Sequence, residues 1–211
     1  MTEPAISERS FSEHRQHIEA TLEPERTAVI VVDMINEFLE DGGLMVLASG
    51  RKLYQPIQQL VDAAHTSGAK VVWLRDEHND LSDPEFRKRI VHCLKGTWGT
   101  QIVDALRPGS DDTIMPKPTY SGFFRTPLHE TLQRMGITTL IVTGVVTNIC
   151  VRSTCHDAFF LGYNVLVPEE CVSATSEREQ ASSLYDIDTH YGTVLGLEDV
   201  LTLLAHQEVA Q

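Results

Sequence analysis

Three side chains that could act together in hydrolysis, a carboxylate, an ammonium and a thiol, each follow a predicted β-strand. Asp33 ends the apolar run RTAVIVV, and Lys117 comes just after a short strand candidate. Cys150 follows the apolar run 139–143 across a tight polar turn. In an open parallel α/β sheet, ligands bind beyond the carboxyl ends of the strands. A base, a fixed positive charge and a nucleophile at that edge would make a hydrolytic centre.

Cys150 opens a predicted helix over 151–161. Unpaired backbone N–H groups and the positive end of the helix dipole favour a thiolate at such a position. The same N–H groups can hold an oxyanion, so one turn could supply both the nucleophile and the oxyanion hole. The alternative is that Cys150 is a small buried apolar residue. The segment by itself supports both interpretations equally.

A second group of polar residues lies in the long segment 75–99. Asp76 and His78 follow the predicted strand 70–75, and His92 comes later in the same loop. One carboxylate and two imidazoles are suitable ligands for zinc or another borderline divalent ion. Alternatively, Asp76 caps the loop and both histidines form hydrogen bonds within it. The Asp-x-His spacing is too common to decide between these interpretations.

Short apolar runs alternate along the chain with helix-length segments. Parallel strands joined by helical crossovers predict a three-layer α/β/α sandwich with a mostly parallel, Rossmann-like central sheet. We expect a polar N-terminal arm over residues 1–25, helical across 10–22, followed by one domain over 26–211. The expected strands are 26–32, 70–75, 112–115, 139–143, 163–167 and 192–195, and the expected helices are 51–67, 99–106, 127–135, 151–161, 176–185 and 197–205.

Composition excludes several classes of protein. With 211 residues, 42% of them hydrophobic, the chain can form one domain with a sizeable core. The net charge of −13 argues against a nucleic-acid partner, because phosphate binding needs a basic surface. The four cysteines form no C-x-x-C pair, and the chain has no apolar signal core, membrane-length run or dinucleotide fingerprint. We therefore expect a cytoplasmic protein without disulfides, membrane contact or nucleotide cofactor.

Three motifs resemble the isochorismatase-like cysteine hydrolases, a family that includes nicotinamidases and N-carbamoylsarcosine amidases. They are AVIVVDMINEF, KPTYSGFFRTPLHETLQRMGI and LIVTGVVTNICVRSTCHDAFFLGYNV, within about residues 27–200. The resemblance implies the same three-layer fold and a catalytic triad of Asp33, Lys117 and Cys150. It also implies a non-proline cis peptide between Val145 and Val146, with the N–H groups of Val146 and Cys150 as the oxyanion hole.

The resemblance extends to the cofactor and the assembly state. Asp76, His78 and His92 occupy the positions of the nicotinamidase metal ligands, whereas the triad chemistry itself requires no cofactor. A homodimer or homotetramer is expected, as is a small-molecule substrate. The candidate residues of the pocket wall, chosen by their position near the strand ends, are Asn36, Phe38, Trp98, Tyr120 and Phe123.

These observations predict a cysteine-dependent amidohydrolase that cleaves a C–N bond in a small carbamoyl, ureido or carboxamide substrate. The reaction would pass through a thioester and release ammonia. A metal-assisted nicotinamidase is the main alternative, but DMINEF and VVTNIC depart from the usual nicotinamidase motifs toward the carbamoylsarcosine-amidase branch. An isochorismatase-type vinyl-ether hydrolase usually lacks the cysteine, and a non-catalytic scaffold would not need all three triad residues.

Overall fold

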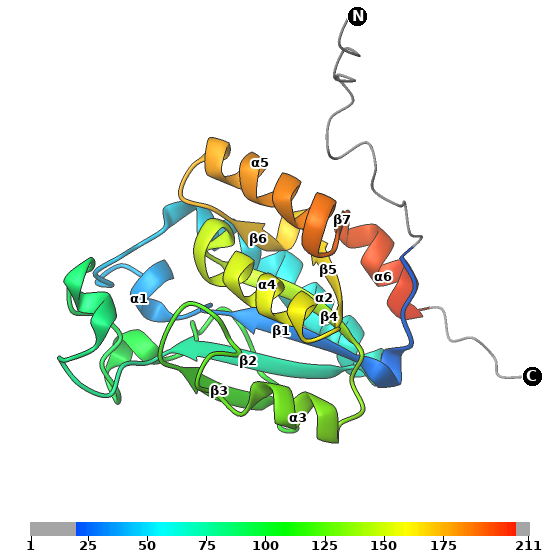
Figure 1. Cartoon of the computed structure of the whole chain (residues 1–211), viewed down its shortest axis with the longest axis horizontal. Helices are drawn as coiled ribbons and strands as arrows, with labels where there is room; N and C mark the ends of the chain where they lie inside the picture. Colours follow the sequence, from blue (N-terminus) through cyan, green and yellow to red (C-terminus); the bar gives the residue numbers. More distant parts are fainter. Residues whose placement is uncertain (1–19, 206–211) are drawn as a thin grey trace, which may run out of the picture.

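A seven-stranded sheet forms the centre of the computed structural model, which describes residues 20–205 (Figure 1). Its strand order is β3-β2-β1-β4-β5-β7, β6 pairs with β4, and every pair is parallel. Residues 1–19, most of the predicted arm, lie outside the described residues. The strands are β1 Thr27–Val32, β2 Lys70–Asp76, β3 Thr113–Lys117, β4 Thr139–Val145, β5 Asn164–Pro168, β6 Val172–Ser173 and β7 Thr193–Leu195.

Helices cover both faces of this sheet, which confirms the predicted sandwich (Figure 1). α2 (Tyr54–Ser67) and α6 (Leu197–Ala205) pack on one face. α3 (Leu128–Arg134) and α4 (Arg152–Phe160) pack on the other, and α5 (Glu177–Asp186) lies beside α4. The sheet therefore contributes to two hydrophobic cores, one under each layer of helices.

β1 shows why its sequence lacks a polar face. All six of its residues are buried, and successive side chains point to opposite faces of a strand. Val29 and Val31 join the core under α2 and α6, whereas Ile30 and Val32 join the core under α3 and α4. A central parallel strand must be apolar on both faces.

The helix predicted over 99–106 is wrong. The segment contains only a 3₁₀ turn, Trp98–Thr100, followed by irregular chain. Ile102 instead forms an antiparallel bridge with Ile35, next to a short helix that the sequence did not indicate, α1 (Asn36–Leu39). Pairing with a distant part of the chain therefore overrides the local helical pattern.

The sequence predicted a strand that ends at Thr143. In the structure, β4 instead continues through Gly144 to Val145. Gly144 pairs with Val32 of β1 and has a φ of +101°. A Cβ atom at Gly144 would lie 2.0 Å from the Val32 carbonyl oxygen. Glycine is therefore required here for two reasons, a left-handed backbone and a close approach of the two central strands.

Within residues 20–205, no helix has the length and apolar character needed to cross a bilayer. Some large apolar side chains are nevertheless exposed, among them Phe124 at 52% and Leu161 at 43%. These surfaces are compatible with the expected homodimer or homotetramer, which stays a prediction.

Replacing Gly144 by alanine should destabilise the fold strongly. The matched control is Gly136→Ala, because Gly136 also has a positive φ (+72°), but a Cβ atom there would meet no described atom within 4 Å. We expect the control to lose about 1–2 kcal/mol from backbone strain. Gly144→Ala should lose about 2 kcal/mol or more beyond that, because the methyl group collides with β1. Urea unfolding measures both, and equal losses would contradict this account.

Candidate active site

The structure brings Asp33, Lys117 and Cys150 together beyond the carboxyl ends of β1, β3 and β4. Lys117 Nζ lies 2.8 Å from Asp33 Oδ2, and the Cys150 thiol is within hydrogen-bonding reach of Asp33. Asp33 and Lys117 are fully buried, and Cys150 is 6% exposed. The three side chains that the sequence singled out therefore form one buried cluster.

Asp33 is fixed by the backbone around it. Its φ of +53° lies in the left-handed region, which a residue with a side chain adopts at a cost of about 1–3 kcal/mol. Its N–H donates to the Leu74 carbonyl at 2.9 Å, and its Oδ1 accepts from the Asp76 N–H at 2.8 Å. Such strain persists where the surrounding contacts fix the conformation. Here it turns the carboxylate toward Lys117.

Lys117 is the last residue of β3 and compensates two buried carboxylates. Besides Asp33, its Nζ lies 3.6 Å from Asp76 Oδ1, and it donates a hydrogen bond of 3.1 Å to the Thr119 carbonyl. A buried ion is tolerated only when it is paired and hydrogen-bonded. Lys117 meets this condition.

Burial decides the protonation of the triad. It raises the pKa of Asp33 to about 6, although the Lys117 charge opposes the shift. Burial likewise raises the pKa of the Cys150 thiol well above its usual value, again against Lys117. Burial would lower the pKa of Lys117, but the neighbouring Asp33 raises it. The resting nucleophile is therefore a thiol beside a carboxylate of raised basicity.

The surroundings of Cys150 differ in two respects from those expected for a thiolate in the first turn of an α-helix. Cys150 lies in a π-helical turn, Thr147–Val151, and not in the first turn of α4. It is also buried, so the loss of hydration outweighs the favourable charge of Lys117. The Val145–Val146 peptide is cis, as the family resemblance implied. The oxyanion-hole role of the N–H groups of Val146 and Cys150 stays a prediction.

Asp76, His78 and His92 also converge, next to Lys117. One donor atom from each lies within 4.8 Å of the others, and all three residues are buried. Asp76 Oδ2 is 3.5 Å from His78 Nε2 and 3.3 Å from His92 Nε2. Asp76 Oδ1 and both Nε2 atoms lack a hydrogen-bond partner among the described residues. This set of donors fits zinc or another borderline divalent ion.

The loop that carries the histidines folds back on itself, as the predicted metal site required. His78 forms a parallel bridge with Leu94, which brings His92 over the end of β2. His92 Nδ1 lies 2.8 Å from the Ile90 carbonyl oxygen, and His78 Nδ1 lies 3.1 Å from Asp83 Oδ2. Partners of this kind orient metal-binding imidazoles. Both Nε2 atoms are thereby directed toward Asp76.

The same charges shift the pKa values of the cluster. Burial would raise the pKa of Asp76, but Lys117, His78 and His92 hold it well below its usual range. Burial would lower the pKa of His78, but Asp76 and Asp83 raise it to about 9. A metal binds neutral imidazole, so loading this site would release protons.

Glu85 joins this cluster, although the sequence analysis did not select it. Its Oε1 lies 3.7 Å from His92 Nε2, its side chain is 7% exposed, and its Oε2 has no partner among the described residues. Glu85 is therefore a fourth possible oxygen donor. The sequence offers several acidic residues in this loop, and nothing in their spacing distinguishes Glu85 from Asp80 or Asp83.

Two of the predicted pocket-wall residues lie beside the metal cluster. The Phe38 ring is 6.1 Å from the His92 ring, and the Tyr120 hydroxyl is within hydrogen-bonding reach of Glu85. Both belong to segments that follow strands at their carboxyl ends. Their roles in substrate binding stay predictions.

The other three make contacts within the fold. The Asn36 amide donates to the Trp98 carbonyl at 3.1 Å, which joins α1 to the distant 3₁₀ turn Trp98–Thr100. The Trp98 side chain is 47% exposed, and the Phe123 ring stacks on Tyr163 at 5.9 Å. The roles of these three residues in the pocket wall also stay predictions.

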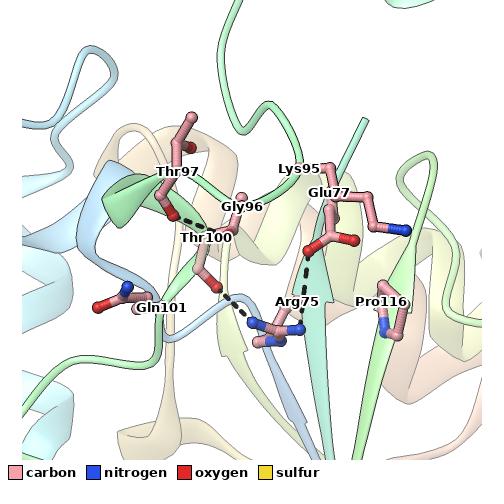
Figure 2. Close-up of a pocket in the computed structure, with 8 residues that line it drawn as sticks. All are labelled: Arg75, Glu77, Lys95, Gly96, Thr97, Thr100, Gln101 and Pro116. Carbon is pink, nitrogen blue, oxygen red and sulfur yellow. Dashed lines mark hydrogen bonds and ion pairs between the residues drawn. The ribbon is translucent and has the colours of Figure 1, made fainter. Parts of the chain in front are cut away.

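A separate cavity of about 450 Å³ lies beside the carboxyl ends of β2 and β3 (Figure 2). In it, Arg75 donates to the Thr100 carbonyl at 3.1 Å and lies 3.7 Å from Glu77. The cavity contains no triad residue and no member of the metal cluster, so we do not place the reaction there. Its lining residues are Arg75, Glu77, Lys95, Gly96, Thr97, Thr100, Gln101 and Pro116.

Known structures resemble this fold over nearly their whole length. A cysteine hydrolase from Pseudomonas syringae pv. phaseolicola is 30% identical, with a TM-score of 0.84 over 90% of this chain and 98% of its own. The N-carbamoylsarcosine amidase from Thermoplasma acidophilum is 32% identical, with a TM-score of 0.75 over 82% and 97%. The pyrazinamidase of Pyrococcus horikoshii, solved in complex with zinc, is 27% identical, with a TM-score of 0.75 over 81% and 99%.

The family model of the isochorismatase domain matches residues 27–199. This range begins at the first residue of β1 and reaches into α6, so it includes all the strands and both buried clusters. Together with the similarity to these solved structures, the match shows that the chain belongs to the isochorismatase-like family of cysteine hydrolases.

Proposed function

We propose that this protein is a cysteine-dependent amidohydrolase that cleaves a C–N bond in a small carbamoyl, ureido or carboxamide substrate and releases ammonia. The observation that carries this proposal is the buried Asp33–Lys117 pair, 2.8 Å apart, with the Cys150 thiol in reach of the same carboxylate. The similarity to an N-carbamoylsarcosine amidase supports the choice of bond.

The first half of the reaction forms a bond to sulfur. Asp33, with its pKa of about 6, takes the thiol proton as Cys150 attacks the carbonyl carbon. Lys117 stabilises the negative charge that moves from the carboxylate to the sulfur. The N–H groups of Val146 and Cys150 would hold the tetrahedral oxyanion. Protonated Asp33 then gives its proton to the leaving nitrogen. The C–N bond of the tetrahedral intermediate breaks, ammonia departs, and the thioester remains.

The second half restores the enzyme. Asp33 takes a proton from water as the water oxygen attacks the thioester carbonyl. The C–S bond breaks, the acid product leaves, and the proton on Asp33 returns to the Cys150 sulfur. One carboxylate thus serves as base and acid in both halves, which a pKa near neutrality permits.

Nicotinamidase activity is the second candidate, and the buried Asp76–His78–His92 cluster favours it. The structural similarity to a zinc-bound pyrazinamidase points the same way. The three residues would hold a divalent ion, with Glu85 in reach as a further donor. When bound, such an ion would polarise a substrate heteroatom or a water molecule near Cys150.

Among the cysteines tested, only Cys150 should be essential for turnover. Cys150→Ala removes the nucleophile and should abolish ammonia release, while circular dichroism shows an unchanged fold. Cys155→Ala and Cys171→Ala are matched controls, because both residues are buried thiols away from the triad and should leave most of the activity. Near-normal turnover by Cys150→Ala would refute the assignment of the nucleophile.

Lys117→Met should remove both activity and stability. The variant keeps a long side chain but leaves Asp33 and Asp76 as buried carboxylates without their counterion. We expect a loss of about 3–5 kcal/mol in the free energy of unfolding, measured with urea in the presence of a chelator. Lys95→Met, at an exposed position, should lose little. A Lys117→Met protein as stable as the wild type would contradict the electrostatic account.

Metal binding can be tested without relying on turnover. Elemental analysis of protein purified without a His-tag should show close to one zinc, iron or manganese per chain. His78→Ala should lower this content, whereas His129→Ala should not, because His129 contacts Tyr163 on α3's side of the sheet. Undiminished activity after complete removal of metal would eliminate the metal-assisted nicotinamidase and leave the triad as the whole catalytic apparatus.

A further inference from the structure

A short basic patch, Arg87–Arg89, lies on the segment that covers the metal cluster. It places three of the chain's 17 lysine and arginine residues in succession, in a protein of net charge −13. All three residues are exposed. None takes part in an ion pair among the residues that the structure describes. Internal salt bridges therefore do not explain the patch.

The residues just before the patch pack against the buried cluster. The Phe86 ring lies 4.7 Å from the ring of His78 and 5.6 Å from that of His92. Glu85 Oε1 lies 3.7 Å from His92 Nε2. Glu85 and Phe86 thus hold the 3₁₀ turn Pro84–Arg87 against the cluster of Asp76, His78 and His92, and the basic side chains that follow are at the surface.

Arg89 connects this turn to the loop that follows β3. Its N–H donates to the Glu85 carbonyl at 3.0 Å, and its guanidinium is within hydrogen-bonding reach of the Tyr120 hydroxyl. Tyr120 comes three residues after Lys117, whose ammonium donates to the Thr119 carbonyl. Arg89 and Tyr120 therefore lie where the segments that follow β2 and β3 meet, near Glu85 and the His92 side of the buried cluster.

We propose that the substrate carries a carboxylate and that Arg89 binds it, with the Tyr120 hydroxyl as a second donor. This inference rests on the proposed function and narrows it to carbamoyl or carboxamide acids, as opposed to neutral amides. A guanidinium offers five N–H donors in a fork that matches a carboxylate, and a neutral phenol engages few of them.

The charge distribution around the site supports this assignment. At the buried end, Lys117, His78 and His92 are already paired with carboxylates, whereas the basic patch at the outer end has no ion-pair partner among the described residues. A substrate with an amide at one end and a carboxylate at the other would therefore bind with its carbonyl toward Cys150. A local positive field also counteracts the repulsion of an anion by a protein of net charge −13.

The test uses two acids, N-carbamoylglycine and maleamate. Each acid is compared with its neutral methyl ester. Binding is measured by calorimetry on Cys150→Ala protein, which cannot turn them over. We expect at least one acid to bind about tenfold or more tightly than its ester. Adding Arg89→Gln should remove this preference by raising the Kd of the acid alone, and Arg89→Lys should restore part of it. Lys88→Gln, the neighbouring control, should change either Kd by less than about twofold.

Turnover separates this inference from the proposed function. In otherwise wild-type protein, Arg89→Gln should raise KM for the acid with little change in kcat. Equal binding of acid and ester, no binding of either acid, or equal effects of Arg89→Gln and Lys88→Gln would overturn the inference. Cys150-dependent ammonia release from an ester or nicotinamide but from neither acid would overturn it while supporting the proposed function. No ammonia release from acids, esters or nicotinamide would overturn the proposed function, and the carboxylate site with it.

Discussion

The buried ammonium of Lys117 is the interaction on which the rest of the site depends. It lies 2.8 Å from Asp33 and 3.6 Å from Asp76, and all three side chains are almost entirely removed from water. Two carboxylates buried so close together would otherwise repel each other and favour protonation. Lys117 compensates both, so the pKa of Asp76 stays well below its usual range, while burial still raises the pKa of Asp33 to about 6. The candidate catalytic residues and the candidate metal ligands thus form one electrostatic unit.

The register of the parallel sheet creates this unit. Asp76 and Lys117 are direct partners in the β2–β3 pairing, so their side chains emerge side by side. Asp33 comes one residue after the end of β1 and is held to β2 through its bond to the Leu74 carbonyl. Gly144 lets β4 pair closely with β1 up to the turn that holds Cys150. The fold therefore aligns groups that belong to four separate segments of the chain.

Around this centre, polarity changes from the inside outward. Carboxylates and imidazoles surround the buried ammonium, Phe86 covers the two histidines, and the basic patch Arg87–Arg89 follows at the surface. The segment after β2 supplies the histidines, Phe86 and the basic patch, and the segment after β3 supplies Tyr120. Differences in specificity within the same catalytic centre can therefore arise from these two loops, while the strand ends keep the chemistry.

The sequence by itself determined the sandwich, the order of its elements, and the convergence of Asp33, Lys117 and Cys150. Hydrophobic periodicity and position at strand ends are local signals, and the parallel topology translates them into proximity. The same reasoning indicated the ligands of the metal cluster, because the residue types and their positions after β2 are visible in the chain.

Only the tertiary structure decided the remaining features. The segment 99–106 lost its helix to pairing with Ile35, and Glu85 was selected from several loop carboxylates by its packing against His92. Burial raises the pKa of the Cys150 thiol, which lies in a π-helical turn, although its sequence position favours a thiolate. The physical reason is common to all three. Burial, desolvation and pairing depend on residues that are distant in the chain, and local sequence patterns do not contain that information.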